Sequence, residues 1–358
     1  MNPHKYKKLN TLFFLCLALM IVKPVGATIL WAGGECDDFL STEGALCSSS
    51  ISYCDPVYAR GATISDGTSS YTVTDFFTPT TSFWVHFKHR NIFPAEVSSS
   101  ADWIQFVDST GIPRLIIEPA TAGNDFQIKI STLDGSSTKV PLFTSTKTVN
   151  SLSLTDFDIF VDYSSGGEIK FYMNKGLITS YTGDITTDGI TALSQLKLGS
   201  YTTSSSRYSY YSEVIISTTD TRSMRLVTLK PVANGNTMDW TGSVTDVNQY
   251  LNDSNTFISS GTAGEIAQFT IPSLPSSSSF DVVALIQSAK ALMTTGSPAN
   301  LRFSVRTGAT DYSSSDISLD VVYEPHNYIW NTNPATSNPW TTAEVGTVGF
   351  NLGIESAN

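Results

Sequence analysis

Apolar and polar residues alternate along residues 156–184, and this alternation is the clearest structural pattern in the chain. Two triplets of apolar residues show it: Phe157, Ile159 and Val161, then Ile169, Phe171 and Met173. Because successive side chains of a strand point to opposite faces, each triplet lies on one face of a strand. Turns containing Gly, Ser and Asn at 164–167 and 174–176 separate three such strands. A meander with one apolar face is typical of half a β-sandwich.

A similar pattern recurs over most of the chain, where short runs rich in Val, Ile, Phe, Tyr and Thr are separated by Gly, Ser, Asn and Asp. It predicts further strands at 82–88, 102–108, 114–118, 125–133, 140–143 and 213–217. Segment 280–293 fits either one helix or the first of two paired strands joined by a loop at 294–299. Strands are favoured there because the neighbours on both sides are strands. The sequence therefore predicts an all-β fold.

A loop around residues 225–236 predicts a domain boundary. After it, Trp240 opens a second series of aromatic and aliphatic positions that is large enough to bury its own core. We expect one domain at 28–231 and a second, smaller β-sandwich domain at 232–358.

The amino terminus has the three-part layout of a secretory signal peptide. Three lysines precede an apolar run at 11–22, and small residues follow it up to Ala27. Residues 1–27 are predicted to be a signal peptide that is cleaved after Ala27, which places the mature protein outside the cell or on its surface. The alternative is an uncleaved anchor, but the run is too short to span a bilayer and Pro24 disfavours a continuing helix. No later stretch is apolar enough to span a membrane.

The charge balance disfavours nucleic acid as a partner. The chain has 21 Lys and Arg against 32 Asp and Glu, a net charge of −11. Removing residues 1–27 takes away four lysines and no acidic residue, which leaves −15. Nucleic-acid binding needs clustered cationic side chains that replace phosphate counterions, and an acidic chain lacks them.

Cysteines and acidic residues gather near the predicted mature start. Cys36, Cys47 and Cys54 favour one disulfide in an exported chain, but their spacing does not say which pair forms. Zinc is the weaker alternative, since there is no CxxC motif and no nearby His. The acidic residues at 35, 37 and 38 fit either a calcium site or, with more weight, a solvated acidic turn.

Tyrosines in a Ser-rich segment are the best candidates for a binding surface. The predicted ligand-binding residues are Tyr201, Arg207, Tyr208 and Tyr210. Tyrosine rings in such a loop can stack on sugar rings or anchor a protein partner. The alternative is that Tyr208 and Tyr210 cover the edge of the sandwich while the loop itself is flexible.

Several longer motifs carry a resemblance to known proteins. These are DWIQFVDSTGIPRLII (102–117), FDIFVDYSSGGEIKFYMNKGLITSYTGD (157–184), LKLGS (196–200) and YSEVIISTTDTRSMRLVTLKP (211–231). They resemble laminin-G-like, concanavalin A-like jelly rolls and, more narrowly, the jelly-roll proteins among bacteriophage virion structural proteins. Two later motifs, LRFSVRTGATDY (301–312) and WNTNPATSNPWTTAEVGTVGFNLGI (330–354), are similar to the carboxy-terminal module of bacteriophage virion structural proteins of the tail or neck. The resemblance implies a jelly roll followed by a smaller sandwich, with protein neighbours in an assembly. A signal peptide departs from it, because virion proteins assemble in the host cytoplasm.

No motif in the chain predicts catalysis, since neither GxSxG nor HExxH occurs. His86 and His89 lie three residues apart in a predicted strand, so they face opposite ways and cannot share a metal. Glycosidases on concanavalin-like folds carry acids at alternating strand positions. In the strand that begins at Glu168, Lys170 and Tyr172 hold the alternate positions instead. We therefore expect no enzyme and no cofactor.

Two functions remain. The first is a non-enzymatic structural or assembly protein, of virion type if the gene is viral, that contacts surface glycans. The alternative is a secreted or cell-surface lectin-like adhesin.

Overall fold

A computed structural model describes residues 10–20, 27–42, 47–48, 62–66, 71–91, 102–121, 125–134, 138–150, 153–187, 189–199, 208–249, 255–274, 280–294 and 298–358. The described elements are antiparallel strands with short 3₁₀ turns at Cys36–Asp38 (η1) and Val244–Asp246 (η3), which confirms the predicted all-β fold. The chain forms two compact units: Pro24–Leu226, and Met1–Lys23 together with Val227–Asn358.

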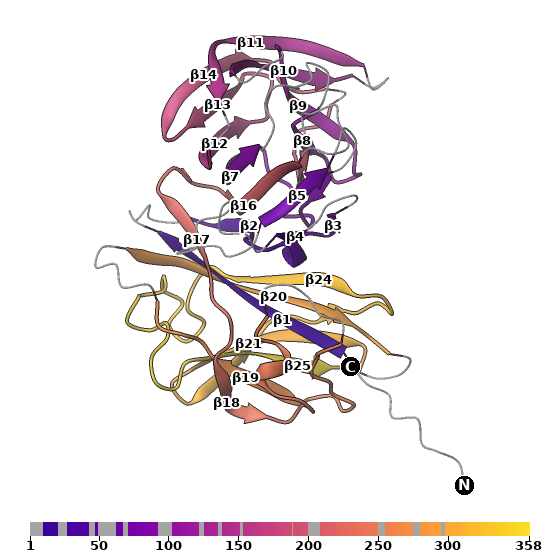
Figure 1. The fold of residues 1–358 in the computed structure, drawn as a ribbon, viewed down its shortest axis with the longest axis vertical. Coiled ribbons are helices and arrows are strands. Elements are labelled where there is room, and N and C mark those ends of the chain that lie inside the picture. The colour runs from indigo at the N-terminus through magenta and orange to yellow at the C-terminus, as the bar shows by residue number, and fades with distance from the viewer. Residues whose placement is uncertain are drawn as a thin grey trace. The chain divides into compact units, whose positions relative to one another are not determined.

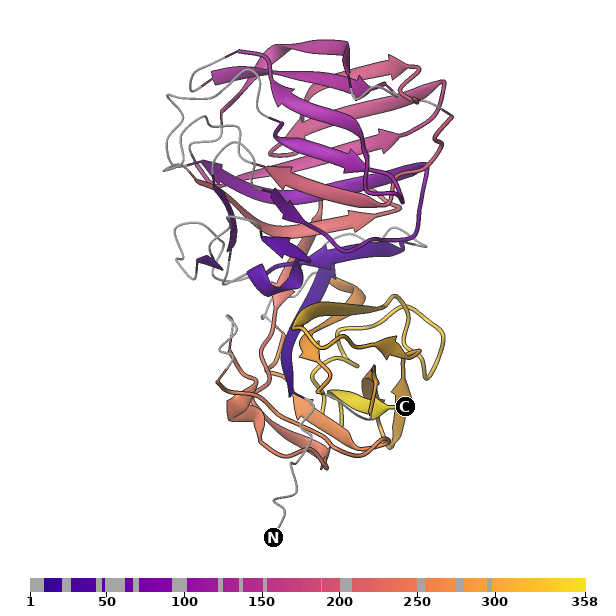
Figure 2. The same ribbon diagram turned by 90° about the vertical axis from the view of Figure 1, so that its right-hand side faces the viewer.

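The first unit is the concanavalin-like jelly-roll sandwich expected from the sequence, made of two face-to-face sheets (Figure 1). Its seven-stranded sheet has the order β11 (Lys139–Asn150), β10 (Asp125–Leu133), β9 (Pro113–Pro119), β8 (Ile104–Val107), β15 (Gln195–Gly199), β6 (Tyr71–Val73) and β3 (Ser41–Thr42). Its eight-stranded sheet has the order β14 (Gly176–Gly183), β13 (Gly167–Met173), β12 (Thr155–Asp162), β7 (Ser82–Asn91), β16 (Tyr208–Ser217), β5 (Ala62–Asp66) and β4 (Cys47–Ser48), and β2 (Ile29–Gly33) pairs with β16. Figure 2 turns the seven-stranded sheet toward the viewer.

The predicted meander is confirmed as β12, β13 and β14. Phe157 lies opposite Met173, and Val161 lies opposite Ile169, so both apolar triplets face the same side. Asn174 and Lys175 join β13 to β14 and both have positive φ. A two-residue turn of this kind matches the right-handed twist of the strands, which is why a short Asn-containing turn is found here.

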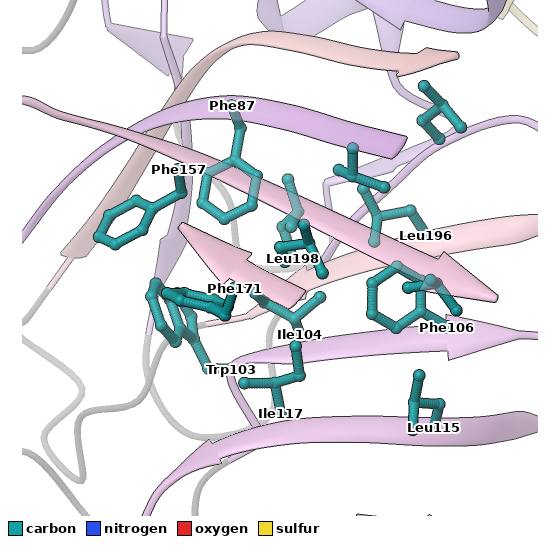
Figure 3. Close-up of a cluster of buried hydrophobic side chains, with 14 of the residues drawn as sticks. Phe87, Trp103, Ile104, Phe106, Leu115, Ile117, Phe157, Phe171, Leu196 and Leu198 are labelled. Atoms are coloured by element: carbon teal, nitrogen blue, oxygen red, sulfur yellow. The ribbon is translucent and has the colours of Figure 1, made fainter. Parts of the chain in front are cut away.

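Aromatic and aliphatic side chains from both sheets fill the space between them (Figure 3). Trp103 is fully buried and its ring meets those of Phe126 and Phe157 edge to face, with centroids 5.8 and 5.3 Å away. Edge-to-face contacts of aromatic rings add to the stability that buried apolar area provides. The core of this unit is therefore built around Trp103, which precedes β8.

The second unit is the predicted smaller sandwich, with two sheets of its own. The four-stranded sheet has the order β17 (Met224–Thr228), β1 (Asn10–Met20), β20 (Asp281–Leu292) and β24 (Glu324–Trp330). The other sheet has the order β18 (Ala233–Met238), β19 (Ile266–Thr270), β25 (Asn351–Ala357), β21 (Asn300–Thr307) and β22 (Thr310–Ser313), and β23 (Ile317–Ser318) pairs with β21. The boundary between the two units falls within β17.

Segment 280–293 is a strand, as favoured from the sequence, but its expected pairing with the next strand is wrong. β20 pairs with β1 and β24, whereas β21 belongs to the opposite sheet. Gln287 of β20 is buried and donates through Nε2 to the carbonyls of Ser304 and Gly353, 3.1 Å from each. This amide joins the two sheets across the sandwich, so the loop after β20 connects two layers instead of closing a hairpin.

The predicted signal peptide contains a strand in this structure. β1 runs antiparallel to β20 from Asn10, opposite Leu292, to Met20, opposite Asp281 (Figure 1). Cleavage after Ala27 stays a prediction.

Candidate functional site

Six polar side chains gather on the outer face of the seven-stranded sheet, and we call them the outer-face cluster. Five of them lie in strands: Tyr71 in β6, Gln105 in β8, Glu118 in β9, Lys129 in β10 and Lys139 in β11. The sixth, Asp102, lies just before β8. Strand alternation explains their position. Ile104 and Phe106 point into the core, so Gln105 between them points outward, and Glu118 lies on the same face next to Lys129 in the register.

Gln105 organises one side of the cluster. Its Nε2 donates to the Tyr71 hydroxyl at 3.0 Å and to the Asp102 carboxylate at 2.8 Å. Gln105 itself is almost fully buried, so these bonds hold its amide in one orientation. The arrangement fixes a phenol, an amide and a carboxylate side by side.

Lys139 joins the two carboxylates of the cluster. Its ammonium donates to Asp102 and, at 2.5 Å, to Glu118. Glu118 is buried and forms a second ion pair with Lys129, 2.6 Å away. Lys139 is the first residue of the edge strand β11, and β10 and β9 lie between β11 and β8 in the sheet. Its side chain therefore links residues of strands that are not neighbours. Two cationic side chains, from β11 and β10, therefore lie beside two carboxylates, from β9 and the residues before β8.

Burial and charge shift two pKa values here. Burial, together with the negative charge of Asp102, raises the pKa of Tyr71 to about 12, so its hydroxyl stays protonated. Burial by itself would lower the pKa of Lys139, but its hydrogen bonds to Asp102 and Glu118 raise it overall. At neutral pH the cluster therefore offers a neutral phenol and a charged ammonium.

The outer face of the eight-stranded sheet carries a different polar group. His86 Nδ1 lies 2.9 Å from Asp158 Oδ1, and Thr221 donates to the same oxygen at 2.8 Å. Nearby, Arg225 makes a bidentate ion pair with the buried Glu213, 2.7 Å at each oxygen. These bonds attach the 221–225 segment to β7, β12 and β16. This group therefore stabilises the fold and has little surface to offer a ligand.

Aromatic rings on that same face are also covered. Trp84 and Tyr172 stack with centroids 5.7 Å apart, and Phe160 packs against Trp84. The Arg222 guanidinium lies over Tyr172 and Trp84, 4.6 and 5.4 Å from their ring centroids. Since the guanidinium occupies the ring faces, these rings are poorly placed to stack on a sugar.

The structure places the predicted tyrosine surface only in part. Tyr201 and Arg207 lie outside the described residues, as does the side chain of Tyr208 in β16. Tyr210 is 5 % exposed, and the buried Tyr211 donates its hydroxyl to the Gly199 carbonyl. Tyr210 thus presents almost no surface in this structure, and a ligand role for the set stays a prediction.

The acidic residues near the mature start are not the solvated turn favoured from the sequence. Glu35 and Asp38 are buried, and Asp38 Oδ2 accepts the N–H groups of Gly34 and Glu35 at 2.8 and 2.9 Å. Within the ranges that the structure describes, no three His, Cys, Asp or Glu side chains gather closely enough to hold a metal ion. The calcium alternative gains no support from this turn.

The cysteine side chains at 36, 47 and 54 lie outside the described residues, so the predicted disulfide is untested. The two histidines behave as predicted. His86 faces outward to Asp158, whereas His89 faces the core. The centroid of the His89 ring lies 4.8 Å from the centroid of the Tyr211 ring.

The sequence reasoning missed the outer-face cluster. The alternation in DWIQFVD does place Gln105 opposite the core positions, and that signal was present. It does not show which distant residues join it, because that depends on the order of strands in the sheet.

None of the helices within the described residues has the length and apolar character needed to cross a membrane.

Comparison with known proteins gives distant structural likenesses only. No protein-family model matches the sequence, and no curated protein matches it. An endo-β-1,4-glucuronan lyase from the fungus Trichoderma reesei aligns with a TM-score of 0.44 and 13% identity over 55% of this chain and 98% of that protein. Cellulose induced protein Cip1 aligns with a TM-score of 0.38 and 13% identity over 52% of this chain and 91% of that chain. Domain 4 of AbnA, a GH43 extracellular arabinanase from Geobacillus stearothermophilus in complex with arabinotriose, aligns with a TM-score of 0.33 and 15% identity over 58% of this chain and 93% of that chain.

These TM-scores all lie below 0.5, so the likenesses assign neither an activity nor a ligand. None of the three proteins is described as a phage protein, and the phage resemblance stays a prediction.

Proposed function

We propose that the jelly-roll unit binds a glycan on the outer face of its seven-stranded sheet, and that the protein is a non-enzymatic binding protein of a surface or particle. The observation that supports this most is the outer-face cluster, in which Lys139 holds Asp102 and Glu118 together beside Gln105 and Tyr71. Four of its six side chains are partly exposed on this sheet face: Tyr71, Asp102, Lys129 and Lys139.

The chemistry of the cluster suits sugar hydroxyls. A hydroxyl is both donor and acceptor, and the cluster offers carboxylate acceptors, ammonium donors and a phenol within one patch. Hydrogen bonds to charged groups are the stronger kind, worth about 1.5–3 kcal/mol each. The ring of the partly exposed Tyr71 adds an apolar surface for a sugar face.

The same geometry favours binding over hydrolysis. A glycosidase keeps its two carboxyl groups apart so that the scissile bond fits between them. Here the Lys139 ammonium fills the space between Asp102 and Glu118 and pairs with both. A sugar bond in that position would have to displace the Lys139 ammonium from both carboxylates.

A second role, assembly with protein neighbours in a virion or other particle, is supported by the resemblance of the sequence to phage virion proteins. Export with cleavage after Ala27 would place either kind of protein outside the cell.

Fractionation of the source culture tests the assembly role. Recovery of the protein in purified particles at fixed stoichiometry would support assembly, while recovery only at the cell surface or in the medium would exclude a virion role.

Replacing Lys139 with Met is expected to weaken glycan binding about 10- to 100-fold, because a charge-assisted hydrogen bond is lost from the site. Glu118 keeps its ion pair with Lys129 in this variant, so the sheet should stay folded. A glycan array would first identify the ligand, and titration calorimetry would then compare the affinities.

Lys170→Met is the matched control for Lys139→Met. Lys170 is 33% exposed against 32% for Lys139, and it is paired with Glu168 at 2.6 Å on the outer face of the other sheet. Its loss should leave glycan affinity unchanged. Equal affinities for both variants, or no glycan bound by the wild-type protein, would contradict the proposed site.

A further inference from the structure

The four-stranded sheet of the second unit depends on a strand from the far end of the chain. Its order is β17, β1, β20 and β24, so β1 lies between two strands that residues 224–292 contribute. Among the strands that the structure describes in this sheet, β1 alone precedes residue 224. We call the place that β1 occupies between β17 and β20 the acceptor slot.

The chemistry of the slot can be inferred from its occupant. Eleven residues, NTLFFLCLALM, pair with β20, and none of them is charged. The register is continuous except for one irregularity between Ala18 and Leu19. The slot therefore accepts an uncharged, largely apolar strand of about this length, held through main-chain hydrogen bonds along β20.

β20 is poorly suited to lie at a sheet edge. Residues 284–289 are buried without interruption, so neither face of the strand is open to water. Its other edge is already paired with β24 from Leu285 to Ala291. Loss of β1 would leave a long apolar strand with unpaired N–H and C=O groups, which is a template for another strand.

We propose that the acceptor slot is a docking site for a strand donated by a different polypeptide, and that β1 closes the slot until it is removed. The proposal rests on the predicted cleavage after Ala27. Cleavage takes β1 away, and the remaining chain, 28–358, contains no other uncharged run as apolar as residues 11–22. A second mature copy therefore lacks an equivalent strand, which leaves a partner protein as the donor.

The test uses the full chain with a site-specific protease sequence inserted among residues 21–26. The folded protein is cut, and the leader is removed by unfolding in urea and refolding. A fluorescent peptide with the sequence of residues 10–20, carrying lysines at one end for solubility, is then titrated by anisotropy. A second peptide with Leu15→Pro serves as the control, because proline removes an N–H from the ladder.

The leaderless chain should bind the wild-type peptide at least tenfold more tightly than the uncut chain, whose slot is filled. The proline peptide should bind about tenfold more weakly, as expected for one lost main-chain hydrogen bond. Hydrogen exchange gives the second readout. Amides of β20 should exchange faster without the leader and regain protection with the wild-type peptide, while β21 stays unchanged.

Three results would overturn the proposal. Equal binding of both peptides would show non-specific adsorption. Full protection of β20 in a monomeric leaderless chain would show that β17 and β20 close the sheet by themselves. Protection of β20 that coincides with a dimer of the leaderless chain would place a second copy in the slot instead of a different protein.

Discussion

The jelly-roll unit is expected to lose about 4–5 kcal/mol of stability through His89 alone when the pH falls from 6.5 to 3. His89 is fully buried among aromatic rings, and this burial lowers its pKa to about 3. The unfolded chain binds a proton near pH 6.5, whereas the folded chain does so only near pH 3. Between these values the unfolded state holds the extra proton, and stability falls by about 1.4 kcal/mol per pH unit.

His86, three residues earlier in β7, should show the opposite behaviour. Burial by itself would lower the pKa of His86, but the Asp158 carboxylate 2.9 Å away raises it above the usual value. Its contribution is therefore fully present below pH 6.5 and is lost as the pH rises through the raised, folded-state pKa. The two histidines together narrow the pH range in which the unit is most stable.

His89→Phe separates this effect from the general titration of carboxylates. Phenylalanine keeps the aromatic contacts with Trp103 and Tyr211 but cannot take up a proton. Urea unfolding at several pH values should show wild type and variant converging near pH 7 and diverging by several kcal/mol near pH 3. If the free energy of unfolding changes with pH equally in the two proteins, His89 takes up a proton as readily in the folded as in the unfolded state. That result would contradict the lowered pKa of His89.

Local pattern predicted the strands well because each strand is recognised from its own residues. The predicted strand at 125–133 has the bounds of β10, and the turn at Asn174 joins β13 to β14 as expected. Alternation alone cannot choose a partner for a strand. β20 is such a case, since the pattern does not encode that Gln287 would connect two sheets or that a strand from residues 10–20 would pair beside it.

The candidate site was harder to predict for the same reason. Tyr71, Gln105 and Lys139 are each unremarkable in sequence, and they meet only because β6, β15, β8, β9, β10 and β11 follow in that spatial order. The tyrosines around Tyr210 were instead predicted to bind a ligand because of the composition of their segment. Composition does not show which side of a strand a ring occupies, and Tyr210 proved to be buried.

Trp103→Ala is expected to destabilise the jelly-roll unit by about 3–5 kcal/mol, the usual cost of truncating a buried tryptophan. The Trp103 ring contacts Phe87, Phe126 and Phe157 edge to face, so alanine would leave a cavity that rigid neighbouring rings cannot fill. Trp103→Phe should cost clearly less, because it keeps an aromatic ring in the same place.

Hydrogen exchange of individual strands can assign this loss to one unit. In Trp103→Ala, amides of β8 and β12 should exchange about 100- to several thousandfold faster, since about 1.4 kcal/mol changes an opening equilibrium tenfold. Trp340→Ala is the control in the other unit, where Trp340 is buried and donates to the Trp330 carbonyl at 2.8 Å. That variant should accelerate β24 and leave β12 unchanged. If Trp103→Ala leaves β12 as protected as in wild type, the core is not built around this side chain, and the aromatic contacts contribute less than their geometry indicates.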